Sequence, residues 1–441
     1  MRVKIIGGGL AGCEAALQLA DAGHDVDLFE MRPSVSTPAH KTGHFAELVC
    51  SNSFKGLALT SAHGLLKEEL ARMGSKLLPL AFESRVPAGE SLAIDREAFS
   101  ARVQGAIESQ PRIRIFREEA RDLDPQNWTL IATGPLTSET LAQRLFSLVG
   151  SSRLFFFDSI APVVMADSLE WDFLFAKNRW DKGEEPDFIN CPLDKEQYYA
   201  FVEALVQADT VEPKPFEKKQ LFEGCLPIEE MARRGPDTLR YGPMRPIGLH
   251  DPRTGKAPFA LIQLRTENRQ KTLYNLVGFQ TRLKWGTQKE ILTRIPGLRQ
   301  ASFARYGAMH RNTFVDSPKV LDANLRIRGT NIFCAGQLTG AEGYTEALST
   351  GLYAASCLHA ALLEEKEKGR NFQWPDATCV GALVRHLTSP NPDFQPMNFN
   401  FGLLPVGPGW PKKQRKTLQI EACQKARQTF EPMNFLSSLK D

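Results

Sequence analysis

Gly7-Gly8-Gly9-Leu10-Ala11-Gly12 is the stretch of this 441-residue sequence that decides its fold. Glycines at positions 7, 9 and 12 form a G-x-G-x-x-G pattern between the apolar run 3–6 and the Ala- and Leu-rich run 11–21. Such a pattern predicts a strand, a tight turn and a helix, in which the second glycine lets a pyrophosphate approach the backbone. The alternative is a glycine turn without a ligand, but the place between a strand and a helix favours a dinucleotide site.

The segments around this loop extend it into an α/β domain. A second apolar run ends in Glu30, whose carboxylate is placed to accept hydrogen bonds from an adenosine ribose. Strands that alternate with helices in this way pack into a parallel sheet. We therefore predict a Rossmann-like domain with strands at 3–6, 25–30, 112–116, 129–134 and 331–336 and helices at 11–21, 95–109 and 346–363.

Two further segments bear on the choice between FAD and NAD, since both dinucleotides use such a loop. Thr133 and Gly134 belong to an Ala-Thr-Gly turn of the kind with which many FAD domains close around the nucleotide. The sequence after Cys334 resembles the second flavin contact of those domains, although an unrelated strand and turn is the alternative. We expect FAD, and the expected cofactor-binding residues are Gly7, Gly8, Gly9, Leu10, Ala11, Gly12, Glu30, Thr133, Gly134, Gly336, Gln337 and Gly340.

Residues 151–300 differ in composition and pattern from the sequence on either side. They contain aromatic and acidic stretches such as Trp171-Asp-Phe-Leu-Phe175, and prolines interrupt them repeatedly. The nucleotide-binding type of sequence returns after residue 330. We therefore predict a discontinuous FAD-binding domain of the glutathione-reductase type, made of residues 1–150 and 301–441, with an inserted α+β domain over residues 151–300.

The composition excludes several classes of protein. Hydrophobic residues make up 42% and charged residues 24%, which is typical of a folded globular chain and not of a disordered one. No apolar run is long enough for a membrane span or a signal peptide, so we expect a cytoplasmic protein without a membrane partner. The eight cysteines lie far apart without zinc-site spacing, so we expect free thiols in a reducing compartment and no metal.

Two of the cysteines stand in sequence contexts that suit chemistry. Cys50 follows an apolar run and precedes a polar turn, and Cys225 follows Gly224, which would let a substrate come close. Taken alone, each cysteine is more typical of a small buried side chain than of a nucleophile. The local sequence therefore leaves both interpretations open.

A set of longer motifs resembles one family. They are residues 7–12, Phe29-Glu-Met-Arg-Pro33, Thr37-Pro-Ala-His40, Phe45-Ala-Glu-Leu-Val-Cys-Ser-Asn-Ser53, Arg85-Val-Pro-Ala-Gly89, Ala132-Thr-Gly-Pro-Leu-Thr-Ser138, Asn190-Cys-Pro192, Tyr241-Gly-Pro-Met-Arg-Pro246, Val277-Gly-Phe-Gln-Thr281 and Tyr306-Gly-Ala-Met-His-Arg-Asn-Thr313. On these motifs, and to about residue 402, the chain resembles the folate- and FAD-dependent tRNA (uracil-5-)-methyltransferases, the TrmFO family.

The resemblance implies transfer of the methylene group of 5,10-methylenetetrahydrofolate to C5 of the T-loop uridine of tRNA. Reduced FAD would complete the methyl group, with NADPH or NADH as reductant. Uracil C5 is a poor nucleophile until a group adds at C6, and a thiolate suits that reversible addition. By resemblance Cys225 would add to C6 and Cys50 would lie by the flavin, although the two roles stay open. The sequence does not identify the base that removes the C5 proton.

The resemblance also implies contacts to the folate. His310 and Tyr344 lie in segments that resemble flavin and folate contacts of the family, so both are candidates to stack on the pterin. A histidine and a tyrosine of the core, with their polar atoms satisfied, are the alternative.

The net charge of +3 is too small to indicate a nucleic-acid binder, so any basic surface must be local. Lys and Arg gather in the inserted region and after Trp410, and a tryptophan beside them could stack on an unpaired base. A solvated helix face is the usual alternative. The RNA-binding candidates are Arg233, Arg234, Arg282, Lys284, Trp285, Lys412, Lys413, Arg415 and Lys416.

Other functions remain open at the level of sequence. The same chemistry could act on a ribosomal RNA uridine, because the motifs describe the reaction and not the RNA. The larger flavin enzyme that modifies the anticodon wobble uridine is similar at its flavin end but carries a long helical extension that we do not find here. A flavin oxidoreductase of a small molecule and a non-catalytic RNA-binding protein that keeps FAD are further alternatives. We expect tRNA, folate and NAD(P)H as partners and no obligate protein partner.

Overall fold

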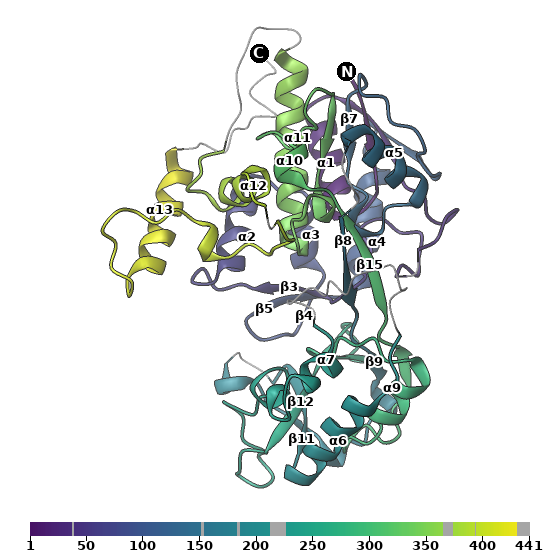
Figure 1. The fold of residues 1–441 in the computed structure, drawn as a ribbon, viewed down its shortest axis with the longest axis vertical. Coiled ribbons are helices and arrows are strands. Elements are labelled where there is room, and N and C mark those ends of the chain that lie inside the picture. The colour runs from purple at the N-terminus through teal and green to yellow at the C-terminus, as the bar shows by residue number, and fades with distance from the viewer. Residues whose placement is uncertain are drawn as a thin grey trace.

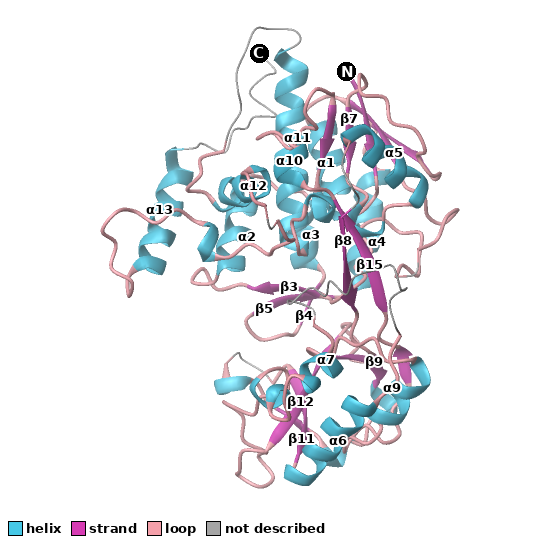
Figure 2. Cartoon of the chain, in the orientation of Figure 1, coloured by secondary structure: helices cyan, strands magenta, loops and turns pink. Residues whose placement is uncertain are grey.

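The computed structural model describes residues 1–37, 39–150, 154–182, 186–211, 226–364, 374–392 and 394–429. Figure 1 shows a larger body that contains the amino-terminal end and a smaller body below it. The antiparallel strands β8 (Leu154–Ser159) and β15 (Met309–Phe314) connect the two bodies. In Figure 2, loops of both bodies meet around the lower ends of these strands. Within the described residues no helix has the length and apolar character needed to cross a membrane.

The larger body is built on a five-stranded sheet in which every neighbouring pair is parallel. The strand order is β16-β7-β1-β2-β6. The strands are β1 (Arg2–Ile6), β2 (Asp25–Phe29), β6 (Ile113–Phe116), β7 (Thr129–Ile131) and β16 (Ile332–Cys334). This sheet confirms the predicted α/β fold with a Rossmann-like dinucleotide-binding unit.

Helix α1 (Leu10–Asp21) packs against the long helix α11 (Tyr344–Glu364), which comes from the other end of the chain. Residues 10–20 of α1 are all buried, and the two polar side chains among them, Glu14 and Gln18, hydrogen-bond to each other at 2.9 Å. A Cβ at Gly351 would lie 2.5 Å from the carbonyl oxygen of Ala11, so glycine is required where the two helices cross. The two ends of the sequence therefore form one core.

The predicted elements are present, with small differences at their ends. The side chain of Asp95 accepts a hydrogen bond from the amide of Ala98, so α4 (Arg96–Glu108) begins directly after this cap. The strands predicted at 129–134 and 331–336 end earlier, because the chain turns into the short helices η1 (Gly134–Leu136) and η6 (Gly336–Thr339).

The smaller body has an antiparallel sheet and a core of its own. The strand order is β10-β11-β12-β13-β9-β14. Its strands are β9 (Val163–Met165), β10 (Phe175–Ala176), β11 (Phe188–Leu193), β12 (Ala260–Thr266), β13 (Leu273–Leu276) and β14 (Phe303–Arg305). Its helices are α6 (Lys195–Gln207), α7 (Ile228–Arg233), α8 (Thr238–Tyr241) and α9 (Trp285–Leu292).

The remaining elements belong to the larger body. A small antiparallel sheet of order β3-β5-β4 lies on its lower side, toward the smaller body (Figure 1). These strands are β3 (Ser53–Gly56), β4 (Arg85–Val86) and β5 (Ser91–Ile94). The helices are α2 (Ala62–Arg72), α3 (Leu77–Glu83), α5 (Glu139–Val149), α10 (Ser317–Val320), α12 (Cys379–Thr388) and α13 (Arg415–Thr429).

Candidate functional site

Three loops meet at one edge of the parallel sheet. The glycine loop follows β1, the turn at Thr133 follows β7 and the turn at Gly336 follows β16, and these three strands are neighbours. The carboxyl ends of parallel strands lie at the same edge, which is where α/β folds bind dinucleotides. Helix η6 contacts both η1 and β15, so the segment after β16, residues 336–340, also lies at this edge.

The glycine loop leaves an open place for a phosphate. Gly7 has a φ of +107°, and a Cβ at Gly12 would overlap the carbonyl oxygen of Gly7, so the turn permits no side chain at either position. Around Gly9, in contrast, no atom lies within 4 Å of the place of a Cβ. Helix α1 begins there without a side chain that caps its first amides. Uncapped helix amides beside an open glycine backbone fit the pyrophosphate of a dinucleotide.

Glu30 closes this cradle at the end of β2. Its Oε2 accepts a hydrogen bond from the amide of Gly8 at 2.9 Å, and its Oε1 accepts from the amide and the Nε of Arg32 at 3.0 and 2.9 Å. Burial opposes ionisation of this carboxyl, but the hydrogen bonds and positive charge of Arg32 outweigh it and lower the pKa of Glu30. The cradle therefore presents an ionised carboxylate where a ribose would lie.

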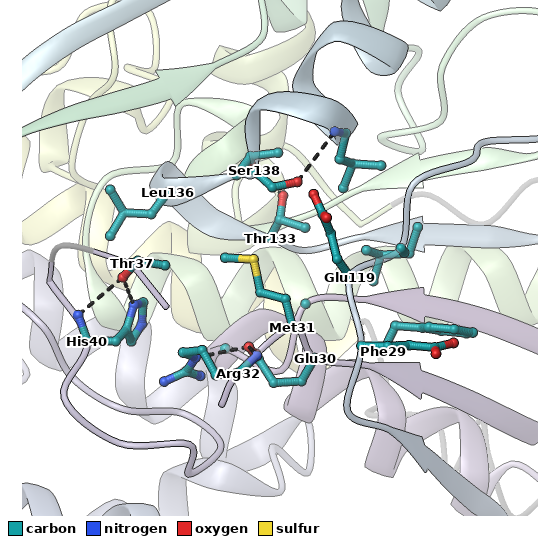
Figure 3. Close-up of a pocket in the computed structure, with 17 residues that line it drawn as sticks. Phe29, Glu30, Met31, Arg32, Thr37, His40, Glu119, Thr133, Leu136 and Ser138 are labelled. Atoms are coloured by element: carbon teal, nitrogen blue, oxygen red, sulfur yellow. Dashed lines mark hydrogen bonds and ion pairs between the residues drawn. The ribbon is translucent and has the colours of Figure 1, made fainter. Parts of the chain in front are cut away.

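A pocket beside Glu30 adds side chains that sequence patterns did not single out. Figure 3 shows side chains that line this pocket from the ends of β2 and β7 and from the loops that follow β2, β6 and β7. The signal that could have found several of them was the pair of family motifs at 29–33 and 37–40. The added residues include Met31, Arg32, Thr37, His40, Glu119, Leu136 and Ser138.

The segment after β16, residues 336–340, contains the remaining cofactor candidates. The amide of Gly336 donates to the Thr350 hydroxyl at 2.9 Å, and the side chain of Gln337 pairs with Glu342. Gly340 has a φ of +86° and lies against the Phe394 ring. Contacts from α11 and its neighbours thus hold this turn at the edge of the sheet.

The cysteine loop, residues 48–52, is held by its backbone. The carbonyl oxygen of Cys50 accepts hydrogen bonds from Nη2 of Arg96 at 3.0 Å and from Nη2 of Arg305 at 3.2 Å. The hydroxyl of Tyr344 accepts from the amide of Cys50 at 3.1 Å and donates to the carbonyl oxygen of Ser51 at 2.8 Å. Among the described cysteines only Cys50 is partly exposed, while the others are buried.

Strand β12 and the residue after it join the smaller body to the cysteine loop. Residues two apart in a strand point to the same face, as Arg265 and Glu267 do here. Nε of Arg265 donates to Oδ1 of Asn52 at 3.0 Å, and Nε of Arg96 donates to Oε2 of Glu267 at 2.6 Å. The loop therefore depends on contacts that exist only when the two bodies are packed together.

Three arginines lie around the cysteine loop, and burial acts on the charge of each. Burial and the guanidinium of Arg96 lower the pKa of Arg305 to about 10, and burial lowers the pKa of Arg265. Burial opposes the charge of Arg96 as well, but Glu267 raises its pKa. The adjoining cavity of about 380 Å³ is lined by cations and carboxylates alike, namely Lys41, Arg96, Arg305, Glu47, Asp95, Glu97 and Glu267. It therefore presents both charges, with guanidinium groups on the side of the cysteine loop.

The structure describes part of the predicted thiol and folate sites. Cys225 lies outside the described residues. His310 belongs to β15, but its side chain lies outside the described part of the chain. The Tyr344 ring packs against Phe54 with centroids 5.4 Å apart, and burial raises the pKa of its phenol. Tyr344 thus holds the cysteine loop as a neutral hydrogen-bonding group.

One RNA-binding candidate is buried. Arg282 is 1% exposed, and its side chain forms ion pairs with Glu229 and Glu230 in the smaller body. Its amide also donates to Glu229 at 2.9 Å. Arg282 therefore stabilises the core and is not placed to contact RNA, which corrects the expectation from its sequence position.

The other RNA-binding candidates lie at the surface. Trp285 is 66% exposed and stacks on Tyr306, with centroids 5.8 Å apart. Nζ of Lys284 lies 3.2 Å from a carboxylate oxygen of Asp209, and Arg233 pairs with Glu230. The remaining exposed candidates are Arg234, Lys412, Lys413, Arg415 and Lys416.

A buried cluster away from this site was not foreseen. The ligand atoms of Glu69, Cys379 and Cys423 lie within 4.8 Å of one another. The carboxylate of Glu69 accepts hydrogen bonds from the amides of Cys379 and Val380, each at 2.8 Å, at the start of α12. Glu69 therefore satisfies two amides of the first turn of α12, beside the cap Thr378, whose hydroxyl accepts from the amide of Gly381. The sequence could not reveal the cluster, because its members come from three distant helices.

Comparison with known proteins places the chain in a family. The family model described as Glucose inhibited division protein A matches residues 2–366. A relative from Natranaerobius thermophilus named Methylenetetrahydrofolate--tRNA-(uracil-5-)-methyltransferase TrmFO is 49% identical over 433 residues, which are 98% of this chain and 99% of the relative. A relative of the same name from Dictyoglomus thermophilum is 51% identical over 426 residues, which are 95% and 96% of the two chains.

A solved structure supports the fold independently. The structure of Aquifex aeolicus GidA in its form I crystal superposes with a TM-score of 0.69 at 16% sequence identity, over 99% of this chain and 78% of that chain. At this identity the likeness shows the fold alone. Together with the family model and the relatives that match almost end to end, it shows that the chain belongs to the TrmFO family within the Glucose inhibited division protein A proteins.

Proposed function

We propose that this chain transfers the methylene group of 5,10-methylenetetrahydrofolate to C5 of the T-loop uridine of tRNA and reduces it to a methyl group, which forms 5-methyluridine. The observation that carries the proposal is the cysteine loop, held by arginines beside a dinucleotide cradle. Support comes from relatives named for this activity that are about half identical to the chain.

FAD is the dinucleotide that we expect in the cradle. The backbone around Gly9 and the first amides of α1 would bind its pyrophosphate, and Glu30 would bind its ribose. The turns at Gly134 and Gly336 would line the rest of the site. When bound, FAD would supply the reducing equivalents that complete the methyl group, and NADPH or NADH would replenish them.

The cysteine loop would contribute chemistry next to this cradle. The amide of Ala46 donates to the carbonyl oxygen of Gly8 at 2.9 Å, so the segment before the loop packs on the glycine loop itself. Cys50 would therefore lie near the bound flavin. Cys225 would add to C6 of uracil, and His310 would contact the pterin. The guanidinium groups of Arg96 and Arg305 would bind the carboxylates of the folate.

The RNA would contact the inserted domain, residues 151–300, and the tail. Exposed cations there, such as Arg234, Lys413 and Lys416, would bind phosphates, and Trp285 would stack on a base. The target uridine must leave its stack to reach the cleft. We place the enzyme in the cytoplasm and infer that it needs no membrane and no obligate protein partner.

Product mapping tests this proposal. Purified FAD-loaded protein is incubated with NADPH or NADH, methylenetetrahydrofolate and unmodified tRNA or ribosomal RNA transcripts, and 5-methyluridine is located by mass spectrometry. We expect product at the T-loop uridine of tRNA. Product on ribosomal RNA alone would assign a different target, and no product on either RNA would contradict the proposal.

Cysteine variants locate the chemistry in the same assay. Cys50→Ala and Cys225→Ala should each abolish methylation while the protein keeps its flavin. Cys191→Ala is the matched control, because this thiol is buried in β11 and should be dispensable. Full activity of Cys225→Ala would remove Cys225 from the role of nucleophile.

A further inference from the structure

Trp180 is an exposed ring on a strained backbone. It lies in the short helix η4 (Arg179–Asp181) of the smaller body and is 63% exposed. Its φ of +60° and ψ of +23° place it in the left-handed region, which a bulky side chain rarely adopts. Asp181, which follows, has a φ of +49°. Such strain persists only where surrounding contacts impose it, and it is characteristic of functional positions.

Contacts on both sides of Trp180 impose this conformation. Its amide donates to the carbonyl oxygen of Gly248 at 2.9 Å, and Nδ2 of Asn178 donates to the carbonyl oxygen of Lys182 at 2.7 Å. A Cβ at Gly248 would lie 2.7 Å from Cε2 of the indole. The ring therefore lies directly on bare glycine backbone and presents its remaining surface to solvent.

Two guanidinium groups accompany the ring. Nη1 of Arg179 donates to the carbonyl oxygen of Ile247 at 2.7 Å, which brings it beside the segment of Arg245. Burial and the positive charge of Arg245 lower the pKa of Arg179. In the part of the chain that the structure describes, neither guanidinium has a carboxylate partner. Two neighbouring cations that have no counter-ion among the described residues form a place for an anion such as a phosphate.

Arg179, the residue before the ring, is connected to the cysteine loop through one face of β12. Gln263 and Arg265 are two residues apart and share that face. Oε1 of Gln263 accepts from Nε of Arg179 at 3.0 Å, and Arg265 donates to Asn52. Residues two apart in a strand are separated by about 6.7 Å. Arg179 and the cysteine loop therefore contact side chains of β12 that are two residues apart.

We infer that Trp180, Arg179 and Arg245 form a nucleotide-binding subsite, in which the indole stacks on an unpaired base of the RNA and the two guanidinium groups bind its phosphate. The inference rests on the proposed function, because it takes an RNA as the substrate. Stacking platforms next to cations are the way in which proteins bind unpaired strands. An RNA is favoured over a protein partner, because every nucleotide of its backbone carries a phosphate for the two guanidinium groups.

Binding measurements on the full-length FAD-loaded protein test this subsite. The probe is a labelled, unmodified T-arm RNA hairpin. Trp180→Ala should weaken binding roughly tenfold, while Trp180→Phe should keep most of the affinity. Trp171→Ala is the matched control, since Trp171 is 46% exposed in the same body, and it should bind as the wild type does. Arg245→Gln should lower the slope of log affinity against log salt by about one.

Several outcomes would overturn the inference. One is unchanged binding by Trp180→Ala, and another is an equal loss in Trp171→Ala. If Trp180→Ala loses as much affinity for a fully paired RNA without the loop as for the hairpin, stacking on an unpaired base is excluded. A wild-type protein that binds no RNA would also contradict the inference. If wild-type protein binds the hairpin but does not methylate it, the proposed function fails and the subsite is still decided by the variants. If Trp180→Ala loses its flavin or its cooperative melting, Trp180→Phe and Arg245→Gln decide the question.

Discussion

The dinucleotide cradle and the cleft at the cysteine loop lie next to each other but are built from different parts of the chain. The cradle is backbone: a turn that excludes side chains at Gly7 and Gly12, and the open amides of α1. The cleft is side chain: guanidinium groups of Arg96 and Arg305 that bind carbonyl oxygens of the loop. A backbone site is damaged by an added atom, whereas a side-chain site is damaged by a lost one.

The largest effect should follow from adding a methyl group to the cradle. Gly12→Ala places a Cβ onto the carbonyl oxygen of Gly7, so the turn must open. We expect loss of the bound flavin and a lower melting temperature, measured by flavin absorbance and by thermal unfolding. Gly9→Ala is the matched control, because its Cβ meets no protein atom within 4 Å. Gly9→Ala should weaken flavin binding but leave the melting temperature of the flavin-free protein unchanged. Equal melting temperatures of the flavin-free wild type, Gly9→Ala and Gly12→Ala would contradict the account.

The second effect comes from removing a cation from the cleft. Arg96→Met leaves Glu267 as a buried carboxylate without its partner, which should cost about 3 kcal/mol of unfolding free energy in urea titrations. Methylation should fall strongly while flavin content stays unchanged. Adding Glu267→Met should restore part of the stability, because the uncompensated charge is removed.

An exposed ion pair provides the control for Arg96. Arg114 pairs with Asp27 on the surface of the parallel sheet, and its side chain is 59% exposed. Arg114→Met should cost less than about 1 kcal/mol and leave methylation intact. Similar losses of unfolding free energy and of methylation in Arg96→Met and Arg114→Met would show that the buried ion pair contributes no more than an exposed one.

A third and smaller effect concerns the hydroxyl that holds the cysteine loop. Tyr344→Phe leaves the carbonyl oxygen of Ser51 without a donor, and we expect kcat to fall about tenfold with the flavin retained. Tyr353→Phe is matched, because this tyrosine lies in the same helix and donates to the carbonyl oxygen of Ala323. Its loss should reduce stability without lowering kcat. Equal kcat in the two variants would remove Tyr344 from the positioning of the loop.

The smallest effect tests a buried lysine near the cysteine loop. Nζ of Lys67 donates to the carbonyl oxygen of Phe54 at 2.7 Å, and burial lowers the pKa of Lys67 from 10.5 to about 8. Between these values the unfolded chain holds the proton more tightly than the folded one, so stability rises with pH in this window. The unfolding free energy of wild type relative to Lys67→Met should rise by about 1 kcal/mol between about pH 7.5 and about pH 9. A flat difference would mean that Lys67 titrates normally.

The contrast between cradle and cleft also explains how far the sequence could be interpreted. Residues 7–12, Glu30 and the turns at Gly134 and Gly336 were predictable, because glycine turns at strand ends are encoded within a few residues. The pairs of Arg96 with Glu267 and of Arg265 with Asn52 were not, because they join residues far apart in the chain.

Charge in the sequence proved a poor guide to exposure. Arg282 and Lys284 look alike in sequence, yet one is buried with Glu229 and the other lies at the surface. Burial depends on which carboxylates the fold brings near, and that is a property of tertiary packing. For the same reason the strained Trp180 carried no signal in the sequence and became visible only in the structure.

Isotope transfer tests the central claim most directly. FAD-loaded protein is given NADPH, unmodified tRNA and methylenetetrahydrofolate that is deuterated at its methylene carbon, and the T-loop nucleoside is analysed by mass spectrometry. The account predicts 5-methyluridine whose methyl group carries both deuterium atoms of the donor and one hydrogen delivered by reduction. A methyl group without deuterium, or no 5-methyluridine at all, would contradict it.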